Sequence, residues 1–144
     1  MTKNHDIQIY GNKLYAIINC SHFVEVMNVE TAKHITQISI PNCRYIVFKD
    51  KYAYVSSYAG PVKIDPNARL GYVARVDTTT LTVKDTCVVG YQPEEMVIVG
   101  NKLYVANSGG YRVPNYDRTV SVIDLNTFRV IKTIDVGINL HRME

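Results

Sequence analysis

A repeated motif constrains the fold of this chain more than any other feature of its sequence. The pentapeptide GNKLY occurs at Gly11–Tyr15 and again at Gly100–Tyr104, and a weaker copy, DKYAY, lies between them at Asp50–Tyr54. A second motif follows each copy and reads VEVMNVETAK, VARVDTTTLT and VSVIDLNTFR in turn. The chain is therefore predicted to consist of three copies of one unit, at residues 6–43, 44–93 and 94–137.

Every unit has the pattern of short β-strands. Segments such as YVANS, VARVD and VSVID are rich in Val, Ile and Tyr and are bounded by Gly, Asn, Asp or Thr. No stretch carries apolar residues at the helical spacing i, i+3, i+4 and i+7. The strands predicted in the third unit are Met96–Val99, Lys102–Ala106, Thr119–Asp124 and Val130–Val136. The middle two strands are apolar on both faces, which is required of a sheet that lies between two others. The length of the repeated unit is typical of a β-propeller blade.

Three segments of the third unit resemble the YVTN-type β-propeller repeat. They read LYVANS at Leu103–Ser108, VSVIDLNT at Val120–Thr127 and KTIDVG at Lys132–Gly137, and Gly90–Pro93 matches the Gly-x-x-Pro loop of that repeat. The composition, with 11 Tyr and no Trp, is similar to that of exported propellers from Bacteroides-type bacteria. The resemblance implies a bacterial protein exported to the periplasm or the cell surface, although this chain shows no signal peptide.

The expected fold is all-β, a single partial propeller domain over residues 1–144 with about three four-stranded antiparallel blades. Three blades cannot close a ring, since propellers typically have 4–8. Residues 138–144 align with the start of a next inner strand. Two arrangements are expected to complete the ring: the chain is part of a longer propeller, or it is a homodimer in which two copies close one ring. An open array of three blades is the third alternative.

Composition excludes several classes of partner and site. The net charge of +3 is too small to suggest a nucleic-acid binder. No run approaches the roughly 18–20 apolar residues of a transmembrane helix. The cysteines, Cys20, Cys43 and Cys87, lack paired metal spacing and are expected to be small buried packing residues. Their odd number means that at least one thiol is free or paired with another molecule.

Insertions in the units indicate a binding face. The separation between the tyrosine of the first motif and the Asn or Asp of the second is 13, 23 and 20 residues in the three units. The additional residues fall between the second and third strands. In a propeller this loop opens on the same face as the connection to the next blade. Insertions on one face of a repeat protein often mark its binding face.

This face is rich in Tyr and Arg, which dominate binding hot spots. The predicted ligand-binding residues are Tyr58, Arg69, Tyr72, Tyr91, Tyr111, Arg112, Asn115, Tyr116 and Arg118, with Arg44 and Tyr45 nearby. The loop of the third unit is the preferred contact, because Gly109 and Gly110 let it turn sharply and Pro114 restricts it. The competing interpretation is structural: the tyrosines cover the blade ends, and the arginines pair with Asp65, Glu94, Glu95 or Asp117.

The expected function is a non-catalytic binding or scaffold propeller that holds a small molecule, a glycan or a protein. No catalytic residue, metal ligand or cofactor is predicted, because the four histidines are scattered and no HExxH, GxSxG or P-loop pattern occurs. One alternative is a propeller enzyme of the lactonase or hydrolase kind, with its groups at the central channel. Another is a structural assembly module. Corrinoid capture is implied by the resemblance alone.

Overall fold

The computed structural model describes residues 6–18, 21–60, 64–110, 112 and 116–136, and these residues form twelve β-strands and no helix. The first sheet contains β1 (Asp6–Tyr10), β2 (Lys13–Ile17), β3 (Phe23–Asn28) and β4 (His34–Ser39). The second contains β5 (Cys43–Lys49), β6 (Tyr52–Ser57), β7 (Leu70–Asp77) and β8 (Thr82–Tyr91). The third contains β9 (Pro93–Val99), β10 (Lys102–Asn107), β11 (Thr119–Asp124) and β12 (Arg129–Asp135).

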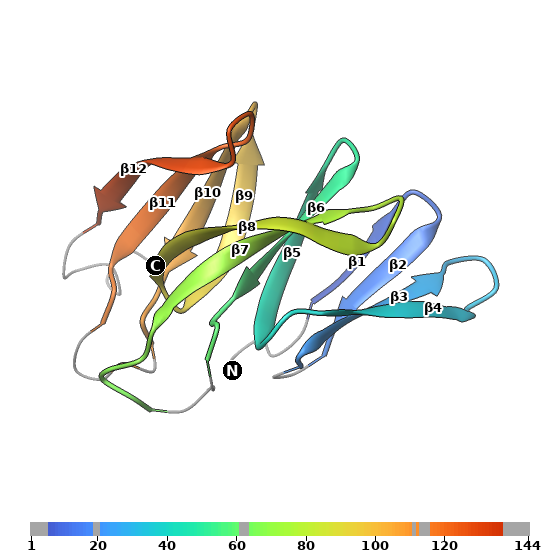
Figure 1. Cartoon of the computed structure of the whole chain (residues 1–144), viewed down its shortest axis with the longest axis horizontal. Coiled ribbons are helices and arrows are strands. Elements are labelled where there is room, and N and C mark those ends of the chain that lie inside the picture. The colour runs from blue at the N-terminus through green and yellow to red at the C-terminus, as the bar shows by residue number, and fades with distance from the viewer. Residues whose placement is uncertain (1–5, 19–20, 61–63, 111, 113–115, 137–144) are drawn as a thin grey trace.

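Each sheet is an antiparallel meander in which neighbours in sequence are neighbours in space. The three sheets stand side by side in chain order, from blue through green to red (Figure 1). The predicted fold class, an all-β chain of three four-stranded antiparallel units, is confirmed. No described segment is a helix that is long and apolar enough to cross a membrane.

Three of the four strands predicted in the third sheet have different bounds in the structure. β10 ends at Asn107 and not at Ala106. β9 begins at Pro93 and not at Met96, because Pro93 pairs with Asn107 beyond a register shift that a residue pattern does not reveal. β12 spans Arg129–Asp135 and not Val130–Val136, since Arg129 pairs with Asp124 across the turn. The predicted start of a next strand at 138–144 lies outside the described residues.

The turns repeat their chemistry from sheet to sheet. Gly11 and Gly100 have φ of 62° and 60°, and Asp50 takes the same conformation, with φ of 54°, in the middle copy. At the β7–β8 turn, the Asp77 carboxylate accepts hydrogen bonds from the amides of Thr79 at 2.7 Å and Thr80 at 3.1 Å. Equivalent side-chain acceptors, Asn28 and Asp124, serve the other two sheets.

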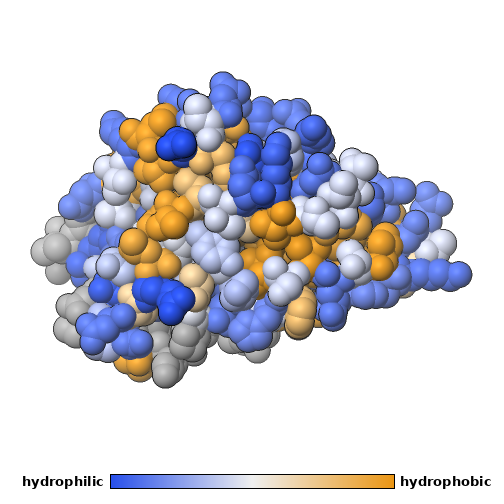
Figure 2. All heavy atoms as spheres, viewed as in Figure 1, coloured by the Kyte–Doolittle hydropathy of each residue, from blue (hydrophilic) through white to orange (hydrophobic). Residues whose placement is uncertain are grey.

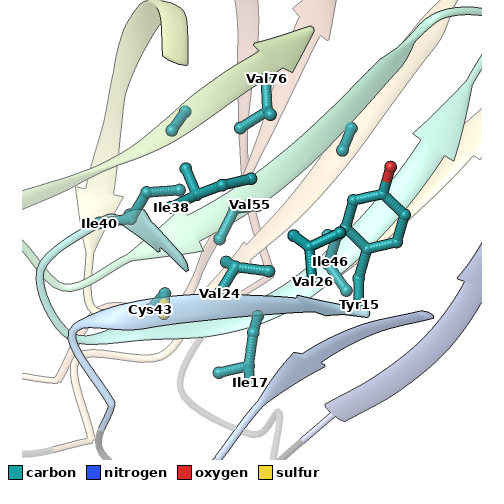
Figure 3. Close-up of a cluster of buried hydrophobic side chains, with 12 residues drawn as sticks. Tyr15, Ile17, Val24, Val26, Ile38, Ile40, Cys43, Ile46, Val55 and Val76 are labelled. Atoms are coloured by element: carbon teal, nitrogen blue, oxygen red, sulfur yellow. The ribbon is translucent and has the colours of Figure 1, made fainter. Parts of the chain in front are cut away.

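Two apolar clusters hold the sheets together. The cluster between the first and second sheets includes Tyr15, Val24 and Val26 from one side and Ile46 and Val55 from the other (Figure 3). The cluster between the second and third sheets includes Tyr54, Val73, Leu103, Val105 and Ile123. The middle strand β6 is therefore buried on both faces, with Val55 0% and Tyr54 2% exposed. Complete burial of one such aliphatic side chain contributes about 1.5–3 kcal/mol.

Candidate ligand-binding face

The loops between second and third strands lie beside the connections between sheets. The amide of Tyr58 donates to the carbonyl of Asn42 at 3.2 Å, which joins the β6–β7 loop to the β4–β5 connection. The amides of Ser108 and Gly109 donate to the carbonyls of Gln92 at 3.2 Å and Tyr91 at 3.0 Å, which joins the β10–β11 loop to the β8–β9 connection. We call this side of the molecule the loop face. The shared face expected from the strand order is thus observed in the described residues.

A cavity of about 360 Å³ opens on the loop face between the β8–β9 connection and the β10–β11 loop. We call it the corner cavity. Its lining residues are Tyr91, Arg112, Tyr116, Asp117, Arg118, Thr119 and Asp135. The cavity lies within the roughly 300–1,000 Å³ that is common for small-molecule sites.

Two arginines in the corner cavity lie against aromatic rings. The Cζ atom of Arg112 is 3.5 Å from the ring centroid of Tyr91, and that of Arg118 is 5.5 Å from the centroid of Tyr116. Both separations are within the range of cation–π attraction. The rings restrict the rotation of the guanidinium groups, so each arginine loses less conformational entropy when it binds an anion.

Asp117 is an anchor of the loop. Its Oδ2 atom accepts a hydrogen bond from the Tyr91 amide at 2.8 Å, and its Oδ1 atom accepts one from the Thr119 hydroxyl at 2.5 Å. Next to it, the Asn107 side chain accepts from the Gly90 amide at 3.1 Å and donates to Ser121 at 2.9 Å. These bonds hold the β10–β11 loop against the β8–β9 connection and give the cavity a fixed wall.

A second cavity of about 290 Å³ lies under the β6–β7 loop. Its lining residues are Tyr58, Gly60, Asp65, Asn67, Ala68, Arg69 and Gln92. The Asp65 carboxylate accepts from the Asn67 amide at 2.9 Å and so shapes the turn that forms one wall. The two insertions predicted from the sequence therefore each form part of a cavity on the same face.

Tyr58 has a structural role beside this second cavity. The residue is only 2% exposed, and its hydroxyl donates to the Oε2 atom of Glu94. The Arg44 guanidinium lies 4.9 Å from the Tyr58 ring centroid, and its Nε donates to the Oε1 atom of Glu94 at 3.0 Å. The structural interpretation, in which an arginine of this face pairs with Glu94, thus applies to Arg44. Burial is the main cause that raises the pKa of Tyr45, and the nearby Glu94 carboxylate raises it further.

The nine predicted binding residues are distributed over three places. Four of them, Tyr91, Arg112, Tyr116 and Arg118, line the corner cavity, and two, Tyr58 and Arg69, line the second cavity. The prediction that Tyr72 lies in an inserted loop is wrong. It lies within β7, which begins at Leu70, and packs half-buried against the cluster between the first two sheets. Tyr111 and Asn115 lie outside the described residues.

Sequence reasoning missed part of each cavity wall. Asp135 faces the corner cavity because β12 pairs with β11 so that Asp135 is opposite Thr119. Gln92 lines the second cavity from the connection between β8 and β9, at a bend where its φ is 48°, whereas the rest of that wall comes from the β6–β7 loop. Strand register places Asp135, which no local motif signals. Gln92 lies within the Gly90–Pro93 motif, but only the contact between sheets makes it part of a cavity wall.

The histidines and cysteines that the structure describes have local packing roles. The Nδ1 atom of His22 accepts from the Asn42 amide at 3.1 Å, and the Nε2 atom of His34 lies 3.0 Å from Glu25 Oε1. Cys43 lies in β5 and is buried, as expected of a packing residue, and burial raises the pKa of its thiol to about 12. Burial also raises the pKa of Cys87. Within the described ranges, no three His, Cys, Asp or Glu side chains gather as metal ligands would.

Comparisons with known proteins support the fold. No family model matches the chain, and neither does any curated protein. Hydrazine synthase from Kuenenia stuttgartiensis is similar in structure, with a TM-score of 0.66 at 21% identity over 85% of this chain and 32% of that one. Apo AztD from Citrobacter koseri has a TM-score of 0.64 at 15% identity, and the match covers 87% of this chain and 32% of the AztD chain.

A third similar structure is the dihydro-heme d1 dehydrogenase NirN, with a TM-score of 0.62 at 12% identity. The match covers 91% of this chain and 27% of NirN, so the chain spans about a third or less of the length of these proteins. Identities this low show the fold alone. The three stacked four-stranded sheets are blades of a partial β-propeller.

Proposed function

We propose that the chain is a non-catalytic binding module of the β-propeller class and that the corner cavity holds a small molecule through an anionic group. The observation that carries this proposal is the pair of arginines, Arg112 and Arg118, each held against a tyrosine in one cavity. A planar guanidinium matches a carboxylate or phosphate group with two parallel hydrogen bonds. A glycan or a protein could present the same group, but the volume of the cavity favours a small molecule.

Two features bear on the charge of the site. The cavity lining contains Asp117 and Asp135 as well as the two arginines, and the Asp117 carboxylate is held in the wall by hydrogen bonds from the Tyr91 amide and the Thr119 hydroxyl. The net charge of the chain is +3, which does not oppose an anionic ligand. The resemblance to the YVTN-type repeat, and with it export to the periplasm or cell surface, belongs to the same proposal and rests on the sequence motifs.

The test measures thermal stabilisation by a panel of small anions, including inorganic phosphate, citrate and glucuronate, followed by calorimetric titration of any that stabilises the chain. We expect the double variant Arg112→Ala/Arg118→Ala to weaken binding at least tenfold, which is about 1.4 kcal/mol. Arg118→Lys should have an intermediate effect, because lysine keeps the charge and loses the planar fork.

The matched control is Glu30→Ala/Lys33→Ala in the β3–β4 turn, at the end of the first sheet away from the loop face. This variant should bind the same anion as tightly as the unchanged chain. Equal binding by both double variants would show that the corner cavity is not the site.

A further inference from the structure

We propose that the ligand of the corner cavity is a monoanion with an aliphatic tail, and that the tail lies in a groove between the second and third sheets. This inference rests on the proposed function, because the corner cavity holds the anionic end. The groove, which we call the junction groove, has a volume of about 340 Å³. Its lining shares Asp117 and Thr119 with that of the corner cavity, so the two spaces adjoin.

Side-chain size explains why space remains at this junction. Between the first and second sheets, Ile38 in β4 and Ile40 just after it are 4% and 1% exposed and belong to the apolar cluster there. Strand pairing places Cys87 and Val89 of β8 at the equivalent positions between the second and third sheets. Each is smaller than the isoleucine to which it corresponds. Because protein interiors are closely packed, smaller side chains at equivalent positions leave space.

The opposite wall of the junction shows the same difference. Tyr72 pairs with Ser57 in the second sheet, and at the equivalent position of the third sheet Thr119 pairs with Asn107. Tyr72 packs against the cluster between the first two sheets, whereas Thr119 lines the junction groove. A small hydroxyl-bearing side chain therefore stands where the other junction has a phenol ring. The groove is thus a property of this junction that the residues on both of its walls create.

Much of the groove wall is aliphatic. Val88, Val89 and Val130 line it, and Val130 also packs against the cluster between the second and third sheets. Val88 is 60% exposed, so part of this apolar wall reaches the surface. On the side of the molecule seen in Figure 1, β8 runs toward the third sheet, and Figure 2 shows apolar groups at the surface there. An aliphatic chain in the groove would remove this apolar area from water, which favours binding.

Several polar groups of the groove already bond to one another. The Thr119 hydroxyl donates to the Oδ1 atom of Asp117 at 2.5 Å. The Nδ2 atom of Asn107 donates to the hydroxyl oxygens of Thr119 at 3.1 Å and Ser121 at 2.9 Å. Polar groups that have partners within the fold gain little from a ligand that offers further hydrogen bonds. The groove therefore favours an apolar tail over a polar one.

The distribution of charge sets the direction in which such a ligand lies. Arg112 and Arg118 line the corner cavity, whereas no lysine or arginine is among the described residues that line the junction groove. The Asp117 carboxylate stands in the shared wall and repels a second negative charge in the groove. The anionic end is therefore held by the arginines and the tail by the groove. A dianion with a charge at each end does not fit this arrangement.

The first measurement is an NMR titration of the isotope-labelled chain with straight-chain carboxylates from acetate to octanoate. We expect the affinity to rise two- to fourfold with each added methylene until the groove is filled, because each buried methylene contributes a similar gain. An affinity that is independent of chain length would overturn this inference and leave the anion site of the proposed function intact. Absence of binding by every carboxylate in the series would instead contradict the proposed function, and this inference with it.

The second measurement narrows the groove with the residue that the first junction carries. Val89→Ile should lower the ratio of octanoate affinity to acetate affinity at least threefold. The matched control is Val83→Ile, the same change at a 39% exposed position of β8 that lines neither cavity, and it should leave this ratio unchanged. Equal ratios in the two variants would refute the placement of the tail.

The third measurement needs no variant and compares octanoate with suberate, the dicarboxylate of the same length. Octanoate should bind the unchanged chain at least tenfold more tightly, because the second carboxylate of suberate would enter the groove beside Asp117 without a cation. Suberate that binds as tightly as octanoate would show that the ligand is not a monoanion with an apolar tail.

Discussion

The Nε atom of Arg44 donates a hydrogen bond to the Oε1 atom of Glu94 at 3.0 Å, which joins the first strand of the second sheet to the first strand of the third. The Arg44 side chain is 4% exposed and that of Glu94 is 22% exposed. The Tyr58 hydroxyl donates to the other carboxylate oxygen of Glu94. One carboxylate therefore connects two inner strands and a loop that are separated by 36 to 50 residues.

We expect Glu94→Ala to lower the free energy of unfolding by about 2 kcal/mol, because it removes the acceptor of a buried guanidinium and of a buried phenol. Glu95→Ala is the matched control at an exposed neighbouring position and should change stability by less than about 0.5 kcal/mol. Urea denaturation followed by circular dichroism measures both values. Equal stability of the two variants would mean that this connection contributes nothing to the packing of the blades.

Gly90, near the end of β8, allows this strand to approach the third blade closely. A Cβ atom there would lie 2.5 Å from both the Asn107 Cγ and the Asp117 Oδ2 atoms. Gly90→Ala should therefore destabilise the chain by about 1–3 kcal/mol, the usual cost of an overpacked site. At Gly110 an added Cβ meets only the Ser108 hydroxyl oxygen, at 3.5 Å, so Gly110→Ala should be close to neutral. Thermal denaturation of the two variants compares them directly.

Asp77 makes part of the stability depend on pH. Hydrogen bonds from the amides of Thr80 and Thr79 lower the pKa of its carboxyl below the ordinary value of 3.8. The folded chain therefore binds this proton less readily than the unfolded chain does. The contribution to stability is complete above the unfolded pKa and is lost as the pH falls through the lower, folded pKa.

The variant Asp77→Asn tests this dependence, because an amide oxygen still accepts the two hydrogen bonds but does not titrate. The stability difference between the unchanged chain and this variant should shrink on acidification from about pH 6 to about pH 2. Asn28→Asp at the equivalent turn is the reciprocal variant and should gain acid sensitivity. A pH-independent difference for Asp77→Asn would show that this carboxylate does not titrate at a shifted pKa.

The Cys43 thiol is predicted to be inert in the folded chain. Burial raises its pKa to about 12, so near pH 8 only about one thiol in ten thousand is the reactive thiolate. In a Cys20→Ser background, alkylation by iodoacetamide should be slow for the native chain and rapid in denaturant. Peptide mass mapping of native labelling gives the measurement, and modification of Cys43 at the rate of an exposed thiol would contradict the expectation.

The sequence by itself determined the number of units, the strand class and the turn chemistry. The repeated GNKLY motif and the equivalent Asn28, Asp77 and Asp124 were readable because each is a local signal, within a turn or a single hairpin. The placement of the insertions on one face also followed, since the direction of each strand in a meander is set by its number along the chain.

Tertiary structure alone decided which residues of that face meet. Tyr58 and Tyr91 were both predicted to bind a ligand. In the structure Tyr58 is buried against Glu94, whereas Tyr91 forms a wall of the corner cavity. The difference arises from contacts across a blade junction and from register shifts such as the one between Val105 and Asn107. Both the contacts and the register shifts depend on how side chains of neighbouring sheets fill a common space. Packing between residues far apart in the chain produces no periodic pattern in the sequence, so it could not be predicted from the sequence.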